Sequence, residues 1–198
     1  MIKKVTIYTL LATLLFAVSS CGIAGKQQIQ ALKESNYDIE SVDQLRIVGM
    51  PMNSLMNGEN VSAKALPAIG MALLQKDVPI QGRINLKISN DTESSTHINQ
   101  FKYKVEIGNR ELFEGTVDEN VIIEPNKEIV VPMSFRANLF EVSEKNSFEN
   151  ILSDIFGDKN DFPITLKIKP SFRIGNNNFY YPGYISVNKI LSKASLLK

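Results

Sequence analysis

The stretch Ile84-Asn85-Leu86-Lys87-Ile88 alternates apolar and polar residues, and Phe101-Lys102-Tyr103-Lys104-Val105-Glu106-Ile107 repeats the pattern further along the chain. Side chains of a strand point alternately to its two faces, so each stretch predicts a strand with one buried face and one wet face. Parallel sheets are covered on both faces and have continuous apolar runs instead. The two stretches therefore predict antiparallel sheets and an all-β fold.

Shorter runs of the same kind lie on both sides of these stretches. Residues 111–115 follow the turn signal Gly108-Asn109, which predicts a hairpin with the preceding strand. Pro132 has no backbone N–H, so its strand should lie at an edge or a bulge. Roughly seven to nine short strands with few helices predict an antiparallel β-sandwich. The further strands are expected at 37–40, 45–48, 121–123, 129–135, 164–168, 172–174, 179–181 and 184–187.

Two segments have helical spacing and are expected as helices inserted into the sandwich. Over 62–75, leucine, isoleucine and alanine recur as on the packed face of a helix, with Pro67 tolerated in the first turn. Over 146–156, apolar residues recur at the same spacing, and Gly157 can end the helix. A helical turn is also expected at 27–33, and Asn57-Gly58 is a turn signal.

The N-terminus reads as an export signal. Lys3 and Lys4 precede an apolar run too short to span a bilayer comfortably, and small residues follow it. Val18-Ser19-Ser20-Cys21 resembles a lipobox, in which the cysteine thiol accepts a diacylglyceryl group before cleavage. An ordinary signal peptide with a chance cysteine, or an uncleaved helix, is the alternative. We expect lipidation at Cys21 and a membrane contact through the N-terminal lipid.

These features divide the chain into four parts. Residues 1–20 are the removed signal, 21–36 the anchor, tether and helical turn, 37–190 one β-sandwich domain, and 191–198 a frayed C-terminus. Gly22 is not the aspartate associated with inner-membrane retention, which favours the outer membrane with the domain facing the periplasm. Cys21 is the single cysteine, so an acylated chain has neither a disulfide nor a cysteine metal site.

No group of residues predicts catalysis, a metal or a cofactor. His97 is the single histidine and lies in a polar stretch, which indicates an exposed loop residue. Asp154, Asp158, Asn160 and Asp161 offer oxygen ligands without the spacing of a calcium loop, so a helix-ending loop is favoured over calcium.

Two acidic pairs are candidates for a general acid and base. Asp38 with Glu40, and Asp118 with Glu119, lack an evident cleft, and the first pair indicates the wet side of a sheet. No enzyme is expected. Basic residues do not cluster with aromatic ones, so nucleic acid is not an expected partner.

The densest aromatic group is Phe179, Tyr180, Tyr181 and Tyr184. Aromatic residues at strand ends pack into cores and corners, and they also line binding surfaces. Both interpretations stay open from the sequence.

The strands from Ile84 to Leu139, with Asn90, Gly115 and Pro125 between them, resemble the late embryogenesis abundant type 2 family. Tyr37-Asp38-Ile39-Glu40-Ser41-Val42 resembles its opening strand, and Asn90-Asp91-Thr92 departs from its usual Asn-Pro-Asn. The two helical insertions resemble lipid-anchored bacterial members of Bacteroides-like type. The resemblance implies a fibronectin-type-III-like sandwich with a role in stress or desiccation protection, and it brings no catalytic residue.

Two other functions compete with this one. The chain could be an adaptor or assembly lipoprotein that binds an envelope protein through a sheet edge or the 62–75 helix. It could also be a carbohydrate-binding module, which would need convergent carboxylates or aromatic rings.

Overall fold

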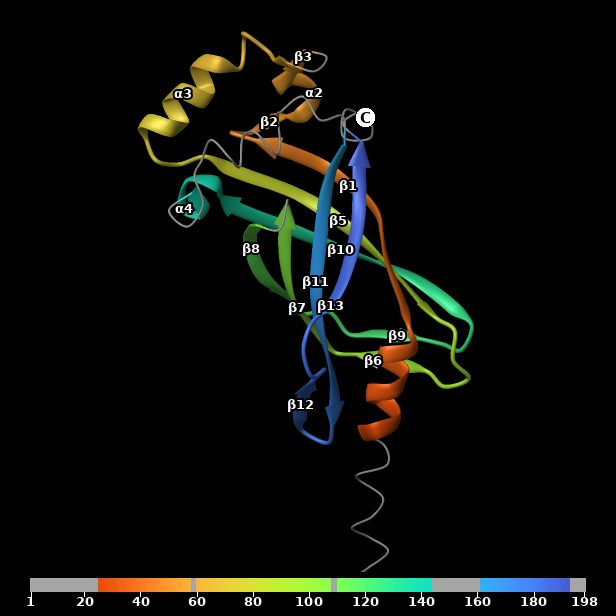
Figure 1. Cartoon of the computed structure of the whole chain (residues 1–198). Helices are drawn as coiled ribbons and strands as arrows, with labels where there is room; N and C mark the ends of the chain where they lie inside the picture. Colours follow the sequence, from red (N-terminus) through yellow and green to blue (C-terminus); the bar gives the residue numbers. More distant parts are fainter. Residues whose placement is uncertain (1–24, 58–59, 108–109, 144–160, 193–198) are drawn as a thin grey trace, which may run out of the picture.

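The computed structural model describes residues 25–57, 60–107, 110–143 and 161–192. In these ranges the chain forms two antiparallel sheets packed face to face (Figure 1). The first sheet has four strands in the order β10-β5-β1-β2. Their bounds are β10 Lys127–Asn138, β5 Pro79–Asn90, β1 Asn36–Ile47 and β2 Met50–Pro51.

The second sheet has five strands, with the path β12-β11-β7-β8 and β13 also paired with β11. The long strand β11, Asp161–Ile174, pairs with β7, Gln100–Ile107, along one side. On its other side it pairs first with β13, Ile185–Ser192, and then with β12, Asn177–Tyr180. Strand β8, Arg110–Val117, forms the expected hairpin with β7. The turn at 108–109 lies outside the described residues.

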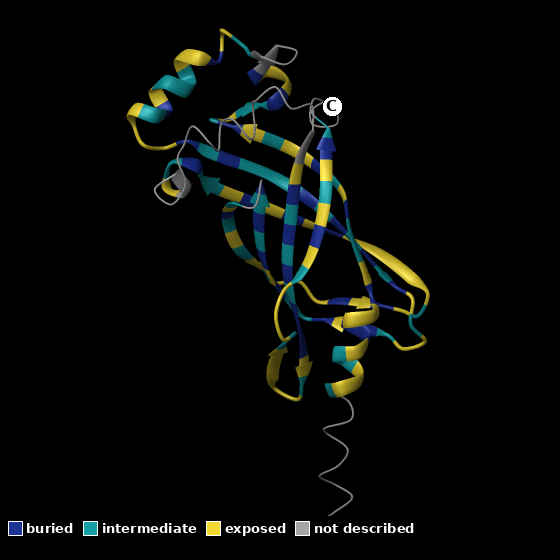
Figure 2. Cartoon of the chain, in the orientation of Figure 1, coloured by how far each residue is buried: buried dark blue, intermediate teal, exposed yellow. Residues whose placement is uncertain are grey.

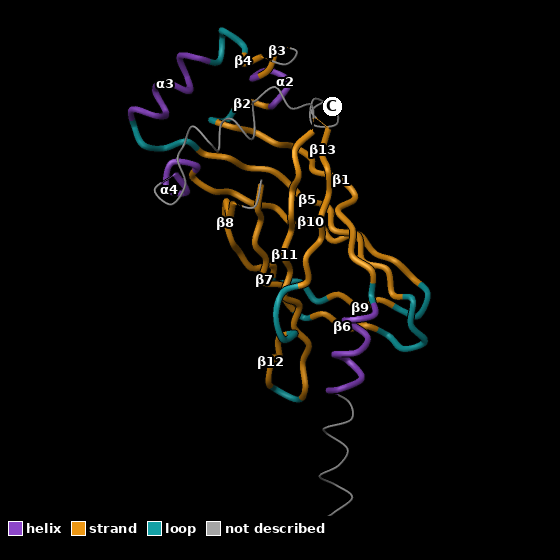
Figure 3. The backbone as a smooth tube through the Cα atoms, viewed as in Figure 1, coloured by secondary structure: helices purple, strands orange, loops and turns teal. Residues whose placement is uncertain are grey.

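Short elements complete the two ends of the sandwich (Figure 3). Strands β6, Thr96–Ile98, and β9, Val121–Ile123, pair at one end, where residues 25–34 are helical. The other end carries the pair β3, Met56–Asn57, and β4, Asn60–Val61, with helices α2, Met52–Leu55, α3, Leu66–Leu74, and α4, Leu139–Ser143. In the described ranges, no helix is both long and apolar enough to cross a membrane.

The core lies between the two sheets, and burial alternates along the strands as the sequence predicts (Figure 2). In β5, Ile84, Leu86 and Ile88 are buried, and in β7 Phe101, Tyr103 and Val105 are buried. An all-β antiparallel sandwich with minor helices is therefore confirmed. β10 is an edge strand, as Pro132 predicted.

Two glycines allow aromatic rings to lie across a strand. A Cβ on Gly82 would meet the Phe135 ring at 2.8 Å, and a Cβ on Gly115 would meet the Tyr103 hydroxyl at 2.6 Å. Freed in this way, the Phe135 ring stacks on Phe113 at 4.5 Å between centroids. Because Phe135 belongs to one sheet and Phe113 to the other, this stack joins the two sheets near their α4 end.

Several element boundaries differ from the sequence expectations. The runs 37–40 and 45–48 are one strand, β1, because register shifts after Ile39 and Asp43 absorb the extra residues, with Gln44 at φ 54°. The run 172–174 continues β11 and does not begin a new strand. β13 continues to Ser192 with Leu191 buried, so the sheet extends past residue 190. The helix expected at 146–156 lies outside the described residues.

The helix expected at 62–75 is shorter, and only part of its apolar face packs as expected. α3 begins at Leu66, next to Pro67, and ends at Leu74. Ile69 and Leu73 pack against the core, but Leu66 is 57% and Leu74 81% exposed. The spacing marked a helix correctly, but helical spacing alone does not show whether the apolar face finds a partner.

Candidate functional site

The aromatic group of the sequence divides between the core and the surface. Tyr181 is partly buried against the core, and its backbone N–H donates to the Pro170 carbonyl. Phe179 lies outside, 6.0 Å from the buried Phe172 ring. Tyr180 and Tyr184 lie near lysines of the second sheet, and these two define the candidate site. The packing interpretation is confirmed for Tyr181, and the binding interpretation stays a prediction for the exposed members of the group.

Three lysine ammonium groups lie over these two tyrosine rings. Lys102 is 4.7 Å from the Tyr180 ring centroid, and Lys104 and Lys169 are each 5.8 Å from that of Tyr184. Such distances give a favourable cation–π attraction. Tyr180 also donates its hydroxyl to the Gln100 side chain, which fixes the ring. We call these five residues the lysine–tyrosine face: Lys102, Lys104, Lys169, Tyr180 and Tyr184.

The face is assembled by the pairing of β7 with β11. In this register Lys102 is opposite Lys169, and Lys104 is opposite Lys167. Sequence reasoning did not predict this face, because the two strands lie far apart in the chain. A signal was present: lysines alternate with buried residues in both strands, so any pairing in phase places lysines together on the wet face.

Carboxylates accompany part of the face. Lys104 forms ion pairs with Glu111 at 2.9 Å and Glu114 at 3.2 Å. The hydrogen bond to Glu111, followed by that to Glu114, raises the pKa of Lys104 above its ordinary value. Lys167 pairs with Glu106 at 2.6 Å. Among the described residues, Lys102 and Lys169 form no ion pair with a carboxylate.

A surface hollow of about 360 Å³ lies beside Lys102 and Tyr184. Its other lining residues are Tyr103, Glu114, Gly115 and Thr116. The Tyr103 ring fills the space that a Gly115 side chain would take. The volume is in the range of small-molecule sites, although the lining is more polar than in most of them.

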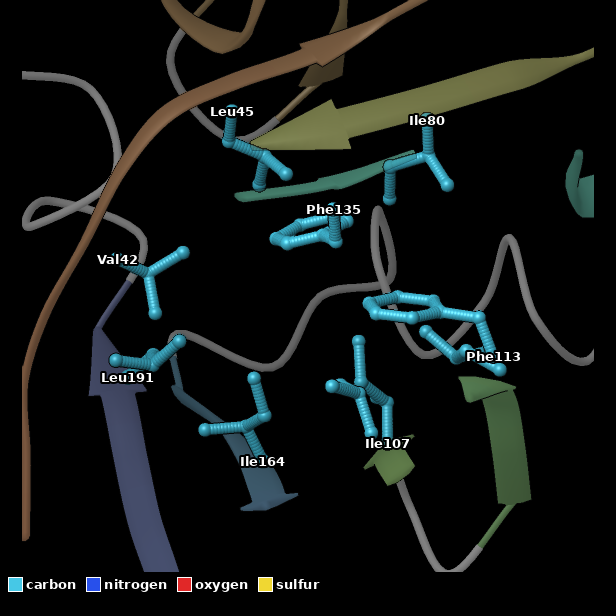
Figure 4. Close-up of a pocket in the computed structure, with 10 residues that line it drawn as sticks. Val42, Leu45, Ile80, Ile107, Phe113, Phe135, Ile164 and Leu191 are labelled. Carbon is cyan, nitrogen blue, oxygen red and sulfur yellow. The ribbon is translucent and has the colours of Figure 1, made fainter. Parts of the chain in front are cut away.

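A second cavity lies between the two sheets and is wholly apolar (Figure 4). Its volume is about 30 Å³, room for one or two waters and far below that of an organic ligand site. It is a packing defect at one end of the core. Ten side chains line it: Val42, Leu45, Ile80, Val105, Ile107, Leu112, Phe113, Phe135, Ile164 and Leu191.

The acidic pairs of the sequence are not brought together as an acid and a base. Asp38 is paired with Lys189 of β13 at 3.2 Å, which links the two sheets. Glu40 is exposed and lines a groove between β1 and β13. Asp118 and Glu119 are both exposed between β8 and β9.

His97 is exposed, as expected, but it lies in strand β6 and not in a loop. The loop assignment was wrong because Thr96 and Ile98 on either side are buried, which makes the run a short strand. Within the described ranges, His, Cys, Asp and Glu form no group of three that could hold a metal. Asp154, Asp158 and Asn160 lie outside those ranges, as does Cys21.

The position of Gly25 indicates where the N-terminal segment joins the sandwich. A Cβ on Gly25 would lie 3.1 Å from the Ile174 side chain, at the end of the β11–β12 hairpin. Helix 25–34 and this hairpin therefore lie together at one end, and α3 lies at the opposite end (Figure 1). Four peptide steps separate Cys21 from Gly25, so covalent geometry keeps their Cα atoms within about 14 Å.

Comparison with known proteins yields only solved structures of low similarity. The chain matches no protein-family profile, and no curated protein matches it. A crystal structure from Archaeoglobus fulgidus is 14% identical, covering 77% of this chain and 98% of the other, with a TM-score of 0.38. An Arabidopsis thaliana protein is 14% identical over 59% of this chain and 70% of the other, with a TM-score of 0.40.

A third solved structure is described as that of a late embryogenesis abundant protein. It is 13% identical and covers 98% of this chain and 91% of the other, with a TM-score of 0.43. Identities and scores this low do not assign the chain to a family.

Proposed function

We propose that the chain is a lipid-anchored, non-enzymatic protein of the bacterial envelope, of the late embryogenesis abundant type 2 class. The observation that carries this proposal is the lipobox Val18–Cys21, followed after a few residues by a β-sandwich. An anchor with more than one acyl chain is stable, because each buried methylene contributes about 0.8 kcal/mol. We place the anchor in the outer membrane with the sandwich facing the periplasm.

The position of Gly25 supports an upright sandwich on this anchor. Gly25 lies against Ile174. The Cα atom of Cys21 is within about 14 Å of the Cα atom of Gly25. In this arrangement helix 25–34 and the β11–β12 hairpin are next to the lipid surface. The α3 end then projects away from it.

A non-enzymatic role is supported by how the candidate groups are used. Asp38 holds Lys189 in an ion pair, and His97 is exposed on a short strand. The stress or desiccation role comes from the sequence resemblance of Ile84–Leu139. It rests on this resemblance and on no residue of a site.

Mass spectrometry of the mature N-terminus tests the anchor. We expect a chain that begins at acylated Cys21 and partitions into detergent, and a Cys21→Ser precursor that does neither. Ser19→Ala is the matched control, because it keeps a small residue in the lipobox and should be processed normally. An unmodified Cys21, or cleavage elsewhere, would overturn the anchor.

Drying survival tests the stress role separately. A deletion strain should survive desiccation less well than the parent, and the intact gene should restore survival where the Cys21→Ser gene does not. Equal survival of deletion and parent strains would remove the stress role and leave the anchor untouched.

A second candidate function, an adaptor, is favoured by α3. All nine residues of this helix are apolar, and Leu66, Met71 and Leu74 are more than half exposed. A helix with exposed apolar side chains of this kind can fill a groove of another protein. Leu66→Ser combined with Leu74→Ser should then remove a stoichiometric partner from purified envelope complexes. A parent protein that purifies without such a partner would contradict the adaptor.

A further inference from the structure

Two lysine pairs lie next to each other on the outer face of β7 and β11, in opposite electrostatic settings. Lys104 and Lys167 face each other, and three carboxylates at 2.6 to 3.2 Å neutralise them: Glu106, Glu111 and Glu114. Lys102 and Lys169 also face each other, but in the described ranges no carboxylate forms an ion pair with either of them. The two lysine pairs of one sheet therefore differ in whether carboxylates balance their charge.

Like charges directly opposite on neighbouring strands are destabilising. Tyrosine rings reduce the cost, since Lys102 lies over Tyr180 and Lys169 over Tyr184. A ring attracts a cation but carries no net charge, so two positive charges remain on this part of the surface. An arrangement that costs folding free energy without an internal counter-charge indicates an external anion.

We propose that Lys102 and Lys169 bind a carboxylate or phosphate group of an anionic glycan, with Tyr180 and Tyr184 flanking its sugar rings. Two ammonium groups on adjacent strands match one anionic group, which accepts charge-assisted hydrogen bonds from both. The hollow of about 360 Å³ beside Lys102 gives a sugar residue room. This site does not depend on the lipid anchor.

The surroundings favour a glycan over an acidic peptide. Tyrosine combines an apolar ring with a polar hydroxyl, which suits a ligand with both apolar and hydroxyl-bearing surfaces. Tyr184 is 40% exposed, so part of its ring remains available. Glu114 also lines the hollow, but Lys104 holds it at 3.2 Å, which limits its repulsion of an anion.

Calorimetric titration of the detergent-solubilised mature protein tests the proposal. The probes are polygalacturonate, an anionic sugar polymer, neutral dextran, and polyglutamate, an anionic chain without sugar rings. We expect polygalacturonate to bind, more weakly at high salt, and dextran not to bind. The double variant Lys102→Ala with Lys169→Ala should lose at least about tenfold in polygalacturonate affinity, as expected when two charge-assisted hydrogen bonds are removed.

The matched control is Lys87→Ala with Lys127→Ala, which removes the same charge from the other sheet and should change affinity less than about twofold. The thermal midpoint of the Lys102/Lys169 variant should equal or exceed that of the parent, because a repulsive pair is removed. Equal losses in both double variants, or no binding of polygalacturonate, would overturn the site. Equally tight binding of polyglutamate would overturn the glycan assignment in favour of an acidic protein segment.

Discussion

The two ends of the sandwich are closed by different chemistry. At the end with helix 25–34, buried polar groups bond to one another and to backbone carbonyls. At the α3 end, apolar side chains meet around a cavity of about 30 Å³. Hydrogen bonds are directional and fix loops in one arrangement, whereas apolar contacts are not and tolerate a small void. The polar end should therefore respond more sharply to single substitutions.

Asn90 is the centre of the polar end. Its side chain is fully buried and donates to the carbonyl oxygens of Ser94, Ile123 and Glu124. Its side-chain oxygen accepts from Thr92. One residue thus ties the end of β5 to the loop that follows it and to the turn between β9 and β10.

The largest expected effect is that of Asn90→Ala. The substitution removes the Asn90 donor from the buried Ile123 carbonyl oxygen, and it removes the partner of Thr92. The Ser94 and Glu124 oxygens keep a second donor, from Thr92 and Lys127, but a buried polar group that loses its partner is costly. We expect the free energy of unfolding, measured by urea denaturation, to fall by about 3 kcal/mol. Asn120→Ala, at an exposed position, is the control and should change it by less than about 0.5 kcal/mol. A loss at Asn90 as small as the control would show that the polar end does not hold the loops.

Tyr37 gives the same end a sensitivity to alkali. Its hydroxyl donates to the Leu32 carbonyl at 2.8 Å and attaches helix 25–34 to β1. Burial raises the pKa of Tyr37 well above its ordinary value of 10.0. Because the folded pKa is the higher one, stability is complete below pH 10 and falls above it, when only the unfolded chain ionises.

We expect the ionisation of Tyr37 in the unfolded chain to lower the free energy of unfolding by up to about 1.4 kcal/mol per pH unit above pH 10. Urea denaturation at successive alkaline pH values measures the slope. Tyr37→Phe should flatten it, although the raised pKa of Tyr103 will keep part of it. Equal slopes in the parent and Tyr37→Phe would contradict the assignment.

The sequence predicted the strands well because their alternation is local. Ile84–Ile88 and Phe101–Ile107 contain both the strand and the identity of its buried face, and the structure keeps them. Bulges were not predictable in the same way. The merging of two runs into β1 depends on pairing with β5, and the alternation within β1 does not report that partner.

The lysine–tyrosine face was not predictable from the sequence for a related reason. Lys102 and Lys169 meet through the register of β7 with β11, which long-range packing decides. The exposed side of α3 was misjudged because apolar periodicity reports a helix and not its neighbours. The lipidation predicted at Cys21, in contrast, depends on the local sequence alone and stays a prediction.

The cavity at the apolar end predicts that a substitution can raise the free energy of unfolding, by less than Asn90→Ala lowers it. Val105 lines the cavity, so Val105→Ile can place one methyl group in it and should raise the free energy of unfolding by about 0.5 to 1 kcal/mol. Val131 is also buried but does not line the cavity. Val131→Ile should therefore lower the free energy of unfolding by about 1 kcal/mol through overpacking. Urea denaturation of both variants checks the contrast. Destabilisation by both would mean that the end is closely packed.

The smallest effect on the free energy of unfolding is expected at Leu74, the last residue of α3. Its side chain is 81% exposed, so Leu74→Ala removes almost no buried area, and alanine favours the helix at least as well. We expect a change below about 0.5 kcal/mol in urea denaturation. Leu55→Ala, at a fully buried position of the same end, is the positive control and should cost several times as much, because it removes a buried side chain.

This contrast decides how α3 is to be interpreted. If Leu74→Ala leaves folding unchanged, any loss of a co-purified partner reports on binding alone, which makes the variant a clean probe of the adaptor function. A large loss of stability would instead mean that Leu74 is covered within the chain itself. The apolar end would then be a closed part of the core, and the difference between the two ends would lie in their chemistry and not in their accessibility.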